Sequence, residues 1–127
     1  TDWSVSGLHN IALMHDSTAR TIAVAYDFDW IGAVDPRYAF PDKSLPIHSV
    51  TERLYRGNCQ TPEQLKVTLD RFRAKRAAID GLFAQVPQLA PDRAKRMKGF
   101  FDEFWKRLDD PRGLQKEIAA DCQKIGN

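Results

Sequence analysis

The sequence predicts a mostly helical α+β protein, in which an N-terminal β-hairpin and an irregular loop pack on about three main helices. Three observations carry this prediction. Apolar residues alternate with small or polar ones within residues 9–29, which is the period of β-strands. Prolines interrupt residues 30–47. From residue 61 onward apolar residues recur every three or four positions, as on amphipathic helices.

The first element expected is a hairpin over residues 9–29. Its connection at 16–20 reads Asp-Ser-Thr-Ala-Arg, which is typical of a turn. Clean alternation marks the return strand, whose apolar side carries Ile22, Val24, Tyr26 and Phe28. If this strand stays extended through Asp29, Asp27 and Asp29 lie on one face, opposite the aromatic side.

The next segment, residues 31–60, is expected to be a loop with one short helix. Pro36, Pro41 and Pro46 exclude a long element before residue 47. A short helix is predicted over 49–55 and should end at Gly57.

The remaining chain, residues 61–127, is expected to form helices with local start signals. Thr61-Pro62-Glu63-Gln64 is a capping box with proline at the first helical position, and Pro87 should stop this helix. Pro91 should open the second helix, and Asp110-Pro111 the third, which should run through Cys122 and Ile125 to Gly126.

Size and charge restrict the function classes. A chain of 127 residues predicts a single domain, 1–127, with a substantial core. The net charge is +2, and basic residues are interleaved with acidic ones, which favours a solvated helix face over a nucleic-acid surface. No apolar run approaches the ~20 residues of a membrane span. We therefore expect neither a nucleic-acid partner nor a membrane span.

Three residues near the hairpin are candidate metal ligands. Asp27 and Asp29 supply carboxylates, and Asn10 on the preceding strand supplies an amide oxygen. Mg²⁺ that bridges phosphates prefers such oxygens. The alternative is that both aspartates end a strand and bond to turn amides, and spacing alone favours this alternative.

The same residues carry a resemblance to known proteins. Asn10-Ile11-Ala12-Leu13 followed by Tyr26-Asp27-Phe28-Asp29 resembles the catalytic and metal loops of atypical kinases, such as aminoglycoside phosphotransferases and spore-coat kinases. The first half of the chain also looks like a family of uncharacterised bacterial proteins, often exported. The matching motifs include Thr1-Asp2-Trp3-Ser4, His9-Asn10, Arg53-Leu54-Tyr55-Arg56-Gly57 and Cys59.

This resemblance implies roles for individual residues. Asn10 and Asp27 would hold Mg²⁺ with support from Asp29, Asp2 would be the catalytic base, and ATP would be the cofactor of the intact protein. Asp2 lies eight residues before Asn10, whereas the kinase loop has a spacing of five, and Asp29 replaces a glycine. No glycine-rich loop or nucleotide-binding lysine precedes Thr1. We therefore expect a C-terminal portion of a larger protein, inactive alone, with the N-terminal part as partner.

The two cysteines, Cys59 and Cys122, show no zinc-site spacing. Spacing alone leaves open two buried thiols or one disulfide. The resemblance to exported proteins favours a Cys59–Cys122 disulfide and a periplasmic or secreted location, with the cytoplasm as the alternative.

A second function class does not need the acidic motif. The chain would then be a non-catalytic helical domain that binds or scaffolds another protein, and Asp27 and Asp29 would be engaged in turns or salt bridges.

Overall fold

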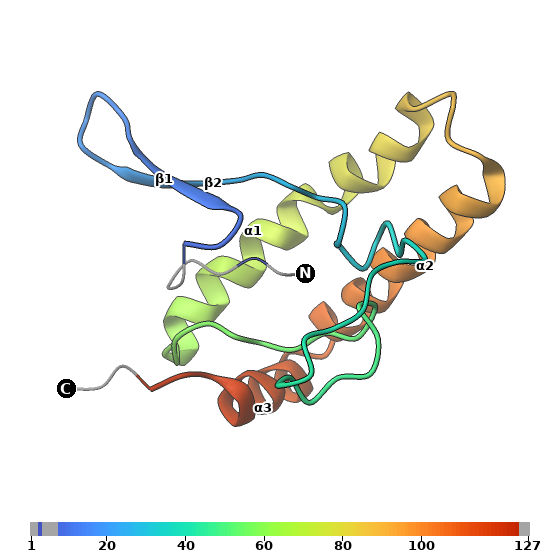
Figure 1. Cartoon of the computed structure of the whole chain (residues 1–127). Coiled ribbons are helices and arrows are strands. Elements are labelled where there is room, and N and C mark those ends of the chain that lie inside the picture. The colour runs from blue at the N-terminus through green and yellow to red at the C-terminus, as the bar shows by residue number, and fades with distance from the viewer. Residues whose placement is uncertain (1–2, 4–7, 125–127) are drawn as a thin grey trace. The chain divides into compact units, whose positions relative to one another are not determined.

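A computed structural model describes residue 3 and residues 8–124 of the chain, which divides into two compact units, Thr1–Arg53 and Leu54–Asn127 (Figure 1). The first unit contains the strands β1 (Ile11–His15) and β2 (Thr21–Ala25). The second contains α1 (Pro62–Gly81), the 3₁₀ turn η1 (Leu82–Gln85), α2 (Pro91–Leu108) and α3 (Pro111–Asp121). The mostly helical α+β class, with one hairpin and three main helices, is confirmed. The single domain expected from chain length stays a prediction.

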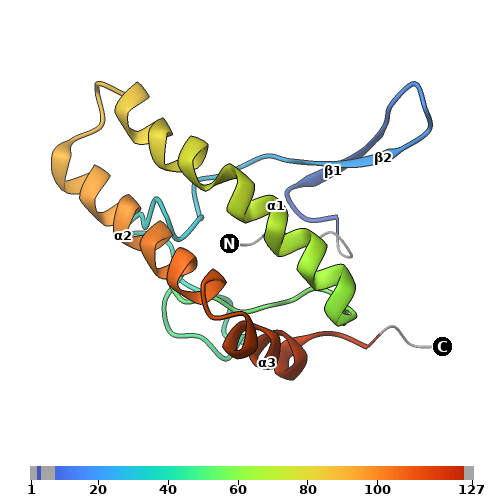
Figure 2. The same ribbon diagram turned by 180° about the vertical axis from the view of Figure 1, so that it is seen from behind.

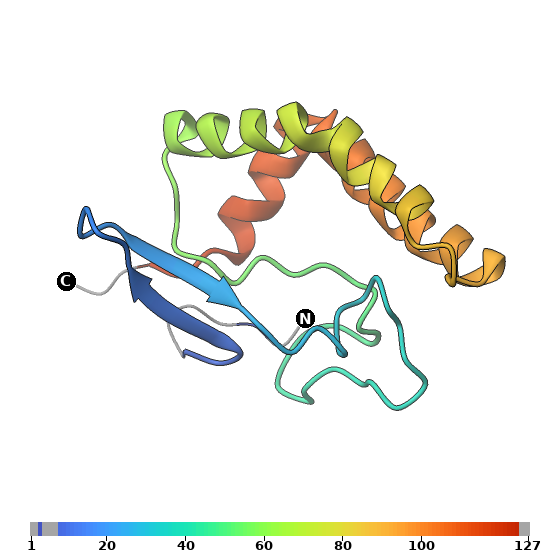
Figure 3. The ribbon, with the colours of Figure 1, turned by 90° about the horizontal axis from the view of Figure 1, so that it is seen from above.

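The predicted hairpin is confirmed, and β1 and β2 pair in antiparallel register from Ile11 opposite Ala25 to His15 opposite Thr21 (Figure 3). Asp16 organises the turn between them. Its Oδ1 accepts the backbone N–H groups of Thr18 at 2.8 Å and Arg20 at 3.0 Å. Ala19 has a φ of 61°, so the carboxylate holds a turn that contains one left-handed residue.

The expected extension of the second strand to Asp29 is wrong. β2 ends at Ala25, and the last ladder bond runs from the Tyr26 N–H to the Asn10 carbonyl at 3.0 Å. Asp27 has a φ of 56°, a left-handed conformation that aspartate tolerates better than most residues and that a strand does not contain. Strand alternation therefore does not place Asp27 and Asp29 on a shared face.

The short helix predicted over 49–55 is also wrong. A single turn forms there, closed by the Glu52 N–H and the Ser49 carbonyl at 3.1 Å. Side chains take the neighbouring backbone groups: Ser49 Oγ accepts from the Thr51 N–H, and Glu52 Oε1 accepts from the His48 N–H. Such local bonds compete with the hydrogen bonds of a helix. A helix of seven residues also makes too few backbone bonds to offset the free-energy cost of its nucleation.

α1 begins as predicted. The Thr61 hydroxyl accepts the Gln64 N–H at 3.3 Å, and the Gln64 side chain accepts the Thr61 N–H at 3.0 Å, which completes the capping box. The helix ends earlier than Pro87. The Leu82 N–H bonds to the Ile79 carbonyl, so the chain tightens into the 3₁₀ turn η1. Val86 has left the helical region, as expected for a residue before proline.

α1 and α2 form an antiparallel pair (Figure 2). Aromatic contacts join α2 to α1 and to the turn that follows α1: Phe72 of α1 meets Phe104 with ring centroids 5.2 Å apart, and Phe83 of η1 meets Phe101 at 5.7 Å. One residue after Phe104, Trp105 donates from its Nε1 to Asp80 Oδ1 at 3.0 Å. Trp105 is buried and Phe72 is 42% exposed, so these aromatic contacts add to the cohesion that buried apolar side chains supply.

The helical unit has one cluster of buried apolar residues, to which all three helices contribute. Trp105 and Leu108 on α2 are its most deeply buried members, with 1% and 0% of their surfaces exposed. The other buried members are Leu65, Leu69 and Ile118. Half-buried side chains packed against the cluster are Tyr55, Ile79, Phe101, Phe104 and Leu114.

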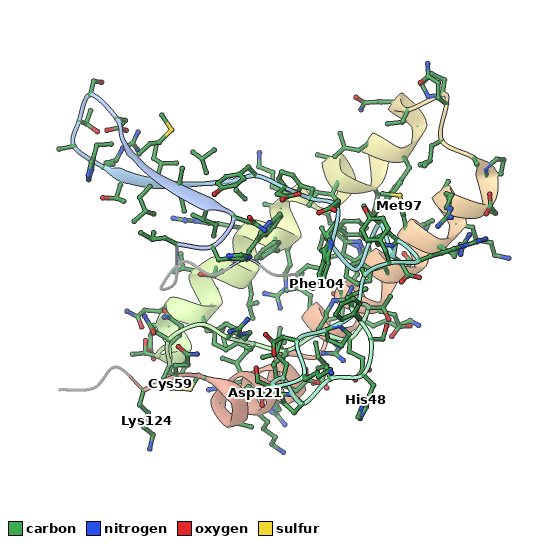
Figure 4. The ribbon with its side chains drawn as sticks, viewed as in Figure 1. His48, Cys59, Met97, Phe104, Asp121 and Lys124 are labelled. Atoms are coloured by element: carbon green, nitrogen blue, oxygen red, sulfur yellow. A yellow bond between two sulfur atoms is a disulfide. The ribbon has the colours of Figure 1, made fainter. Side chains whose placement is uncertain are left out.

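A disulfide joins Cys59 to Cys122, so the predicted pairing is confirmed, with Cα atoms 4.8 Å apart. Figure 4 shows Cys59 beside the end of α3, near Asp121. α3 ends at Asp121, earlier than predicted, because Cys122 is extended and Gln123 pairs with a separate segment. The Gln123 N–H donates to the Gly57 carbonyl at 2.9 Å, and its carbonyl accepts the Cys59 N–H at 3.0 Å. Ile125 and Gly126 lie outside the described residues.

Candidate functional site

The candidate metal ligands Asn10 and Asp27 lie at the open end of the hairpin. The backbone bond between Tyr26 and Asn10 brings Asn10 opposite the residue that precedes Asp27. Asn10 and Asp27 both have left-handed backbone conformations, with φ of 52° and 56°. The chain therefore leaves the extended conformation just before β1 and just after β2. These left-handed residues, rather than strand alternation, set the directions of the Asn10 and Asp27 side chains.

Trp3 packs on this end of the hairpin. Its indole Nε1 donates to the Tyr26 carbonyl at 3.0 Å and lies 3.3 Å from the Asp27 carbonyl. Its ring meets the Phe28 ring edge-on, with centroids 4.7 Å apart. These contacts hold the backbone on both sides of Asp27. Because Trp3 and Asp27 are far apart in the sequence, no local sequence pattern predicts them.

Asp29 is engaged by a tyrosine from the following loop. Tyr38 Oη donates a hydrogen bond to Asp29 Oδ2 at 3.1 Å. This bond raises the pKa of the Tyr38 phenol, and desolvation and the negative charges of Asp29 and Asp27 add to the increase. Both carboxylates therefore act electrostatically on one phenol. The loop after β2 carries Tyr38 and brings its hydroxyl to Asp29, so this contact does not depend on strand alternation.

The described residues contain no group of three or more His, Cys, Asp and Glu side chains arranged to hold a metal ion. The predicted set is of a different kind, with two carboxylates and one amide. Asp2, the candidate catalytic base, lies outside the described residues. The proposed roles of Asp2, Asn10, Asp27 and Asp29 all stay predictions.

The apolar surface of the hairpin is a candidate site that the sequence analysis did not identify. The two bonds at the hairpin ends, Tyr26 to Asn10 and Asp16 to Arg20, define the alternation of the antiparallel ladder. This alternation places Ala12, Met14, Ile22, Val24 and Tyr26 on one side, which we call the apolar face. Its four large side chains are all exposed: Met14 by 56%, Ile22 by 45%, Val24 by 42% and Tyr26 by 50%.

The signal for this face was present in the sequence. β1 and β2 read Ile-Ala-Leu-Met-His and Thr-Ile-Ala-Val-Ala, without one Asp, Glu, Lys or Arg. Natural sheets usually protect exposed edges with charges or proline. The absence of both from two neighbouring strands distinguishes this hairpin from an ordinary surface element.

The helical unit has a shallow depression of about 180 Å³ between α1 and α3. Leu65 and Leu69 form its floor, and Lys66 and Arg73 stand at its rim. Both cations bond to Asp70, at 2.6 Å and 2.8 Å, and hold the pKa of that carboxyl below its usual value. The depression is therefore lined by apolar surface and by charges that are already paired.

Comparisons of the chain with protein-family models, with curated proteins and with solved structures found no match. Among the helices of residues 8–124, none is long and apolar enough to cross a membrane.

Proposed function

We propose that this chain is a disulfide-bonded, non-catalytic protein-binding module. Its helical unit, Leu54–Asn127, serves as the stable scaffold, and its hairpin is the binding element. The observation that carries the proposal is the exposed apolar face of Met14, Ile22, Val24 and Tyr26. A two-stranded hairpin is only marginally stable by itself, and contiguous exposed apolar side chains mark interaction surfaces.

The engagement of Asp29 supports a binding role over a catalytic one. The non-catalytic alternative expects Asp27 and Asp29 to be engaged in turns or salt bridges. Asp29 instead accepts the Tyr38 hydroxyl, a different contact that also engages this carboxylate within the protein. The disulfide supports a location in an oxidising compartment, periplasmic or secreted, because cytosolic thiols are usually kept reduced.

Peptide selection tests the binding role. Peptides displayed from a random library are selected on the immobilised full chain, and their affinities are compared for the wild type and for an Ile22→Ser, Val24→Ser double variant. We expect binding to weaken at least about tenfold, since loss of central apolar anchors typically costs more than 1 kcal/mol each.

Val67→Ser is the matched control, because Val67 is 55% exposed on α1 and should not affect binding. Circular dichroism confirms that each variant keeps its helices. Peptides that bind the double variant as tightly as the wild type would contradict the proposal.

A second candidate is a phosphotransferase-like protein that binds Mg²⁺ through Asn10, Asp27 and Asp29 and ATP in the intact protein. The specific observation in its favour is that the Tyr26–Asn10 backbone bond brings Asn10 opposite the residue before Asp27, while Asp29 follows two residues later and accepts the Tyr38 hydroxyl. Carboxylate pairs with an amide oxygen are a donor set that suits Mg²⁺.

The Tyr38 phenol offers a direct readout of this candidate. If Mg²⁺ binds the two carboxylates, their charge is neutralised and the pKa of Tyr38 should fall toward its ordinary value. Absorbance titration of tyrosine with and without Mg²⁺, combined with calorimetry of Mg²⁺ and ATP, measures this. Equal titration curves with and without Mg²⁺, and no heat that depends on Asp27→Asn, would eliminate the candidate.

A further inference from the structure

We propose that the outer edge of β2 pairs with the β2 edge of a second copy of this chain, in antiparallel register about Ala23, to form a four-stranded sheet. This inference deepens the proposed binding function by naming the partner. It concerns the backbone edge of the hairpin, whereas the peptide selection above tests its apolar face.

The ladder alternation identifies which backbone groups are available at this edge. The Tyr26 N–H bonds to the Asn10 carbonyl and the Asp16 N–H bonds to the Arg20 carbonyl, so every second pair between these two lies at a hydrogen-bonded position of the ladder. The N–H and carbonyl groups of Thr21, Ala23 and Ala25 therefore point away from β1. The described residues contain no third strand in this sheet, and these groups form a free edge.

Pairing about Ala23 uses the whole strand. Ala23 lies opposite Ala23 of the second copy, Thr21 lies opposite its Ala25, and Ile22 lies opposite its Val24. The apolar faces of the two hairpins then join into one surface across four strands. Small side chains at 23 and 25 let the two backbones approach without steric conflict.

The charge pattern favours this edge and this direction. β2 contains no charged residue, Arg20 precedes it and Asp27 follows it. Antiparallel pairing about a twofold axis places Arg20, whose guanidinium also pairs with Asp16 at 2.6 Å, opposite Tyr26 of the second copy, the residue before its Asp27. Parallel pairing would instead oppose like charges, which is unfavourable.

The edge of β1 lacks this complementarity. Asp16 follows β1, and no lysine or arginine precedes it within residues 8–10. Self-pairing of β1 would therefore place no opposite charges at its ends. A contact of five residues per strand is smaller than a standard protein interface, so a weak, concentration-dependent dimer is expected.

Charge variants at position 23 provide the test. Sedimentation of the full chain over a wide range of concentration should show reversible dimers, and amide exchange should slow at Thr21, Ala23 and Ala25 as dimers form. Ala23→Lys and Ala23→Glu each place like charges opposite each other and should weaken association at least about tenfold. Mixing the two variants should restore association, which also shows that both are folded.

Leu13→Lys is the matched control, because Leu13 is the direct partner of Ala23 across the hairpin and leaves the β2 edge intact. It should dimerise like the wild type. A wild type that stays monomeric at every concentration, or dimers that Leu13→Lys weakens and Ala23→Lys does not, would overturn the inference. Peptide binding at the apolar face could still be intact in either case, so the two proposals fail separately.

Discussion

The indole Nε1 of Trp105 donates a hydrogen bond to Oδ1 of Asp80 at 3.0 Å, and this bond links the C-terminal part of α2 to the C-terminal part of α1. The guanidinium carbon of Arg76 lies 5.4 Å from the centre of the same ring, on the side of α1. Trp105 thus joins an apolar contact, a hydrogen bond and a cation–π contact in one side chain. With 1% of its surface exposed, it is, together with Leu108, one of the two most deeply buried of the described residues.

Trp105→Ala should therefore destabilise the helical unit by about 3–5 kcal/mol, the usual range for removal of a buried aromatic side chain. Urea unfolding followed by circular dichroism measures the change. Trp105→Phe should cost less, because it keeps an aromatic ring in the cluster and loses only the bond to Asp80 and part of the volume. Equal stability of the alanine variant and the wild type would show that Trp105 does not support the core.

Arg73→Lys should lower the free energy of unfolding by about 1–2 kcal/mol. The Arg73 guanidinium donates one bond to Asp70 Oδ1 at 2.8 Å and another to the Leu108 carbonyl at 2.7 Å, so it satisfies the C-terminal end of α2 from α1. A lysine ammonium keeps the charge, but it lacks the two terminal nitrogens with which the guanidinium bonds to Asp70 and to the Leu108 carbonyl at the same time. Urea unfolding again gives the value.

Arg96→Lys is the control, because it makes the same replacement at an arginine with a single exposed ion pair. Arg96 forms one exposed pair with Asp92 within α2, at 3.0 Å, and surface pairs of this type contribute little. We expect a change of less than about 0.5 kcal/mol. If both variants lose the same stability, the bond between Arg73 and the Leu108 carbonyl has no special contribution.

The disulfide should contribute about 4 kcal/mol to the stability of the helical unit, because it closes a loop between residues separated by 63 positions. A Cys59→Ser, Cys122→Ser variant compared with the oxidised wild type in urea measures this contribution. Thiol counting under denaturing, non-reducing conditions should find no free thiol in the wild type. Two free thiols would refute the bridge.

Local signals in the sequence predicted the helix starts well. The capping box at Thr61 and the prolines at 62, 91 and 111 act within one helical turn, so the information needed to place them is contained in a few neighbouring residues. Helix ends were predicted less well. The end of α3 depends on the backbone pairing of Gln123 with the segment around Asn58, and this pairing has no local signature.

The candidate site shows the same division. Alternation along β2 predicted a hairpin, but the position where β2 ends depends on the left-handed conformation of Asp27 and on Trp3, which bonds to the Tyr26 carbonyl from 23 residues away. The contact between Asp29 and Tyr38 likewise needs the path of the intervening loop. Alternation also defined an apolar face without showing that this face is exposed, since exposure depends on what the rest of the chain covers.

Acidic pH should loosen the hairpin turn through Asp16. Hydrogen bonds from Thr18 and from Arg20 lower the pKa of Asp16 from its usual value of 3.8 to about 2. A carboxyl whose pKa is lower in the folded state stabilises the fold above its unfolded pKa and loses this contribution as the pH falls through the folded pKa. The turn should therefore be intact at pH 4 and above and weaken as the pH approaches about 2.

The backbone amide signals of Thr18 and Arg20 report this transition in NMR spectra, because both amides donate to the Asp16 carboxylate at 2.8 Å and 3.0 Å. Asp16→Asn keeps an acceptor oxygen and removes the titrating group, so its amide signals should not change with pH in this range. Amide signals in the wild type with a midpoint near 3.8 would show that the Thr18 and Arg20 bonds do not hold the carboxylate in solution, and that the turn relies on the left-handed conformation of Ala19 instead.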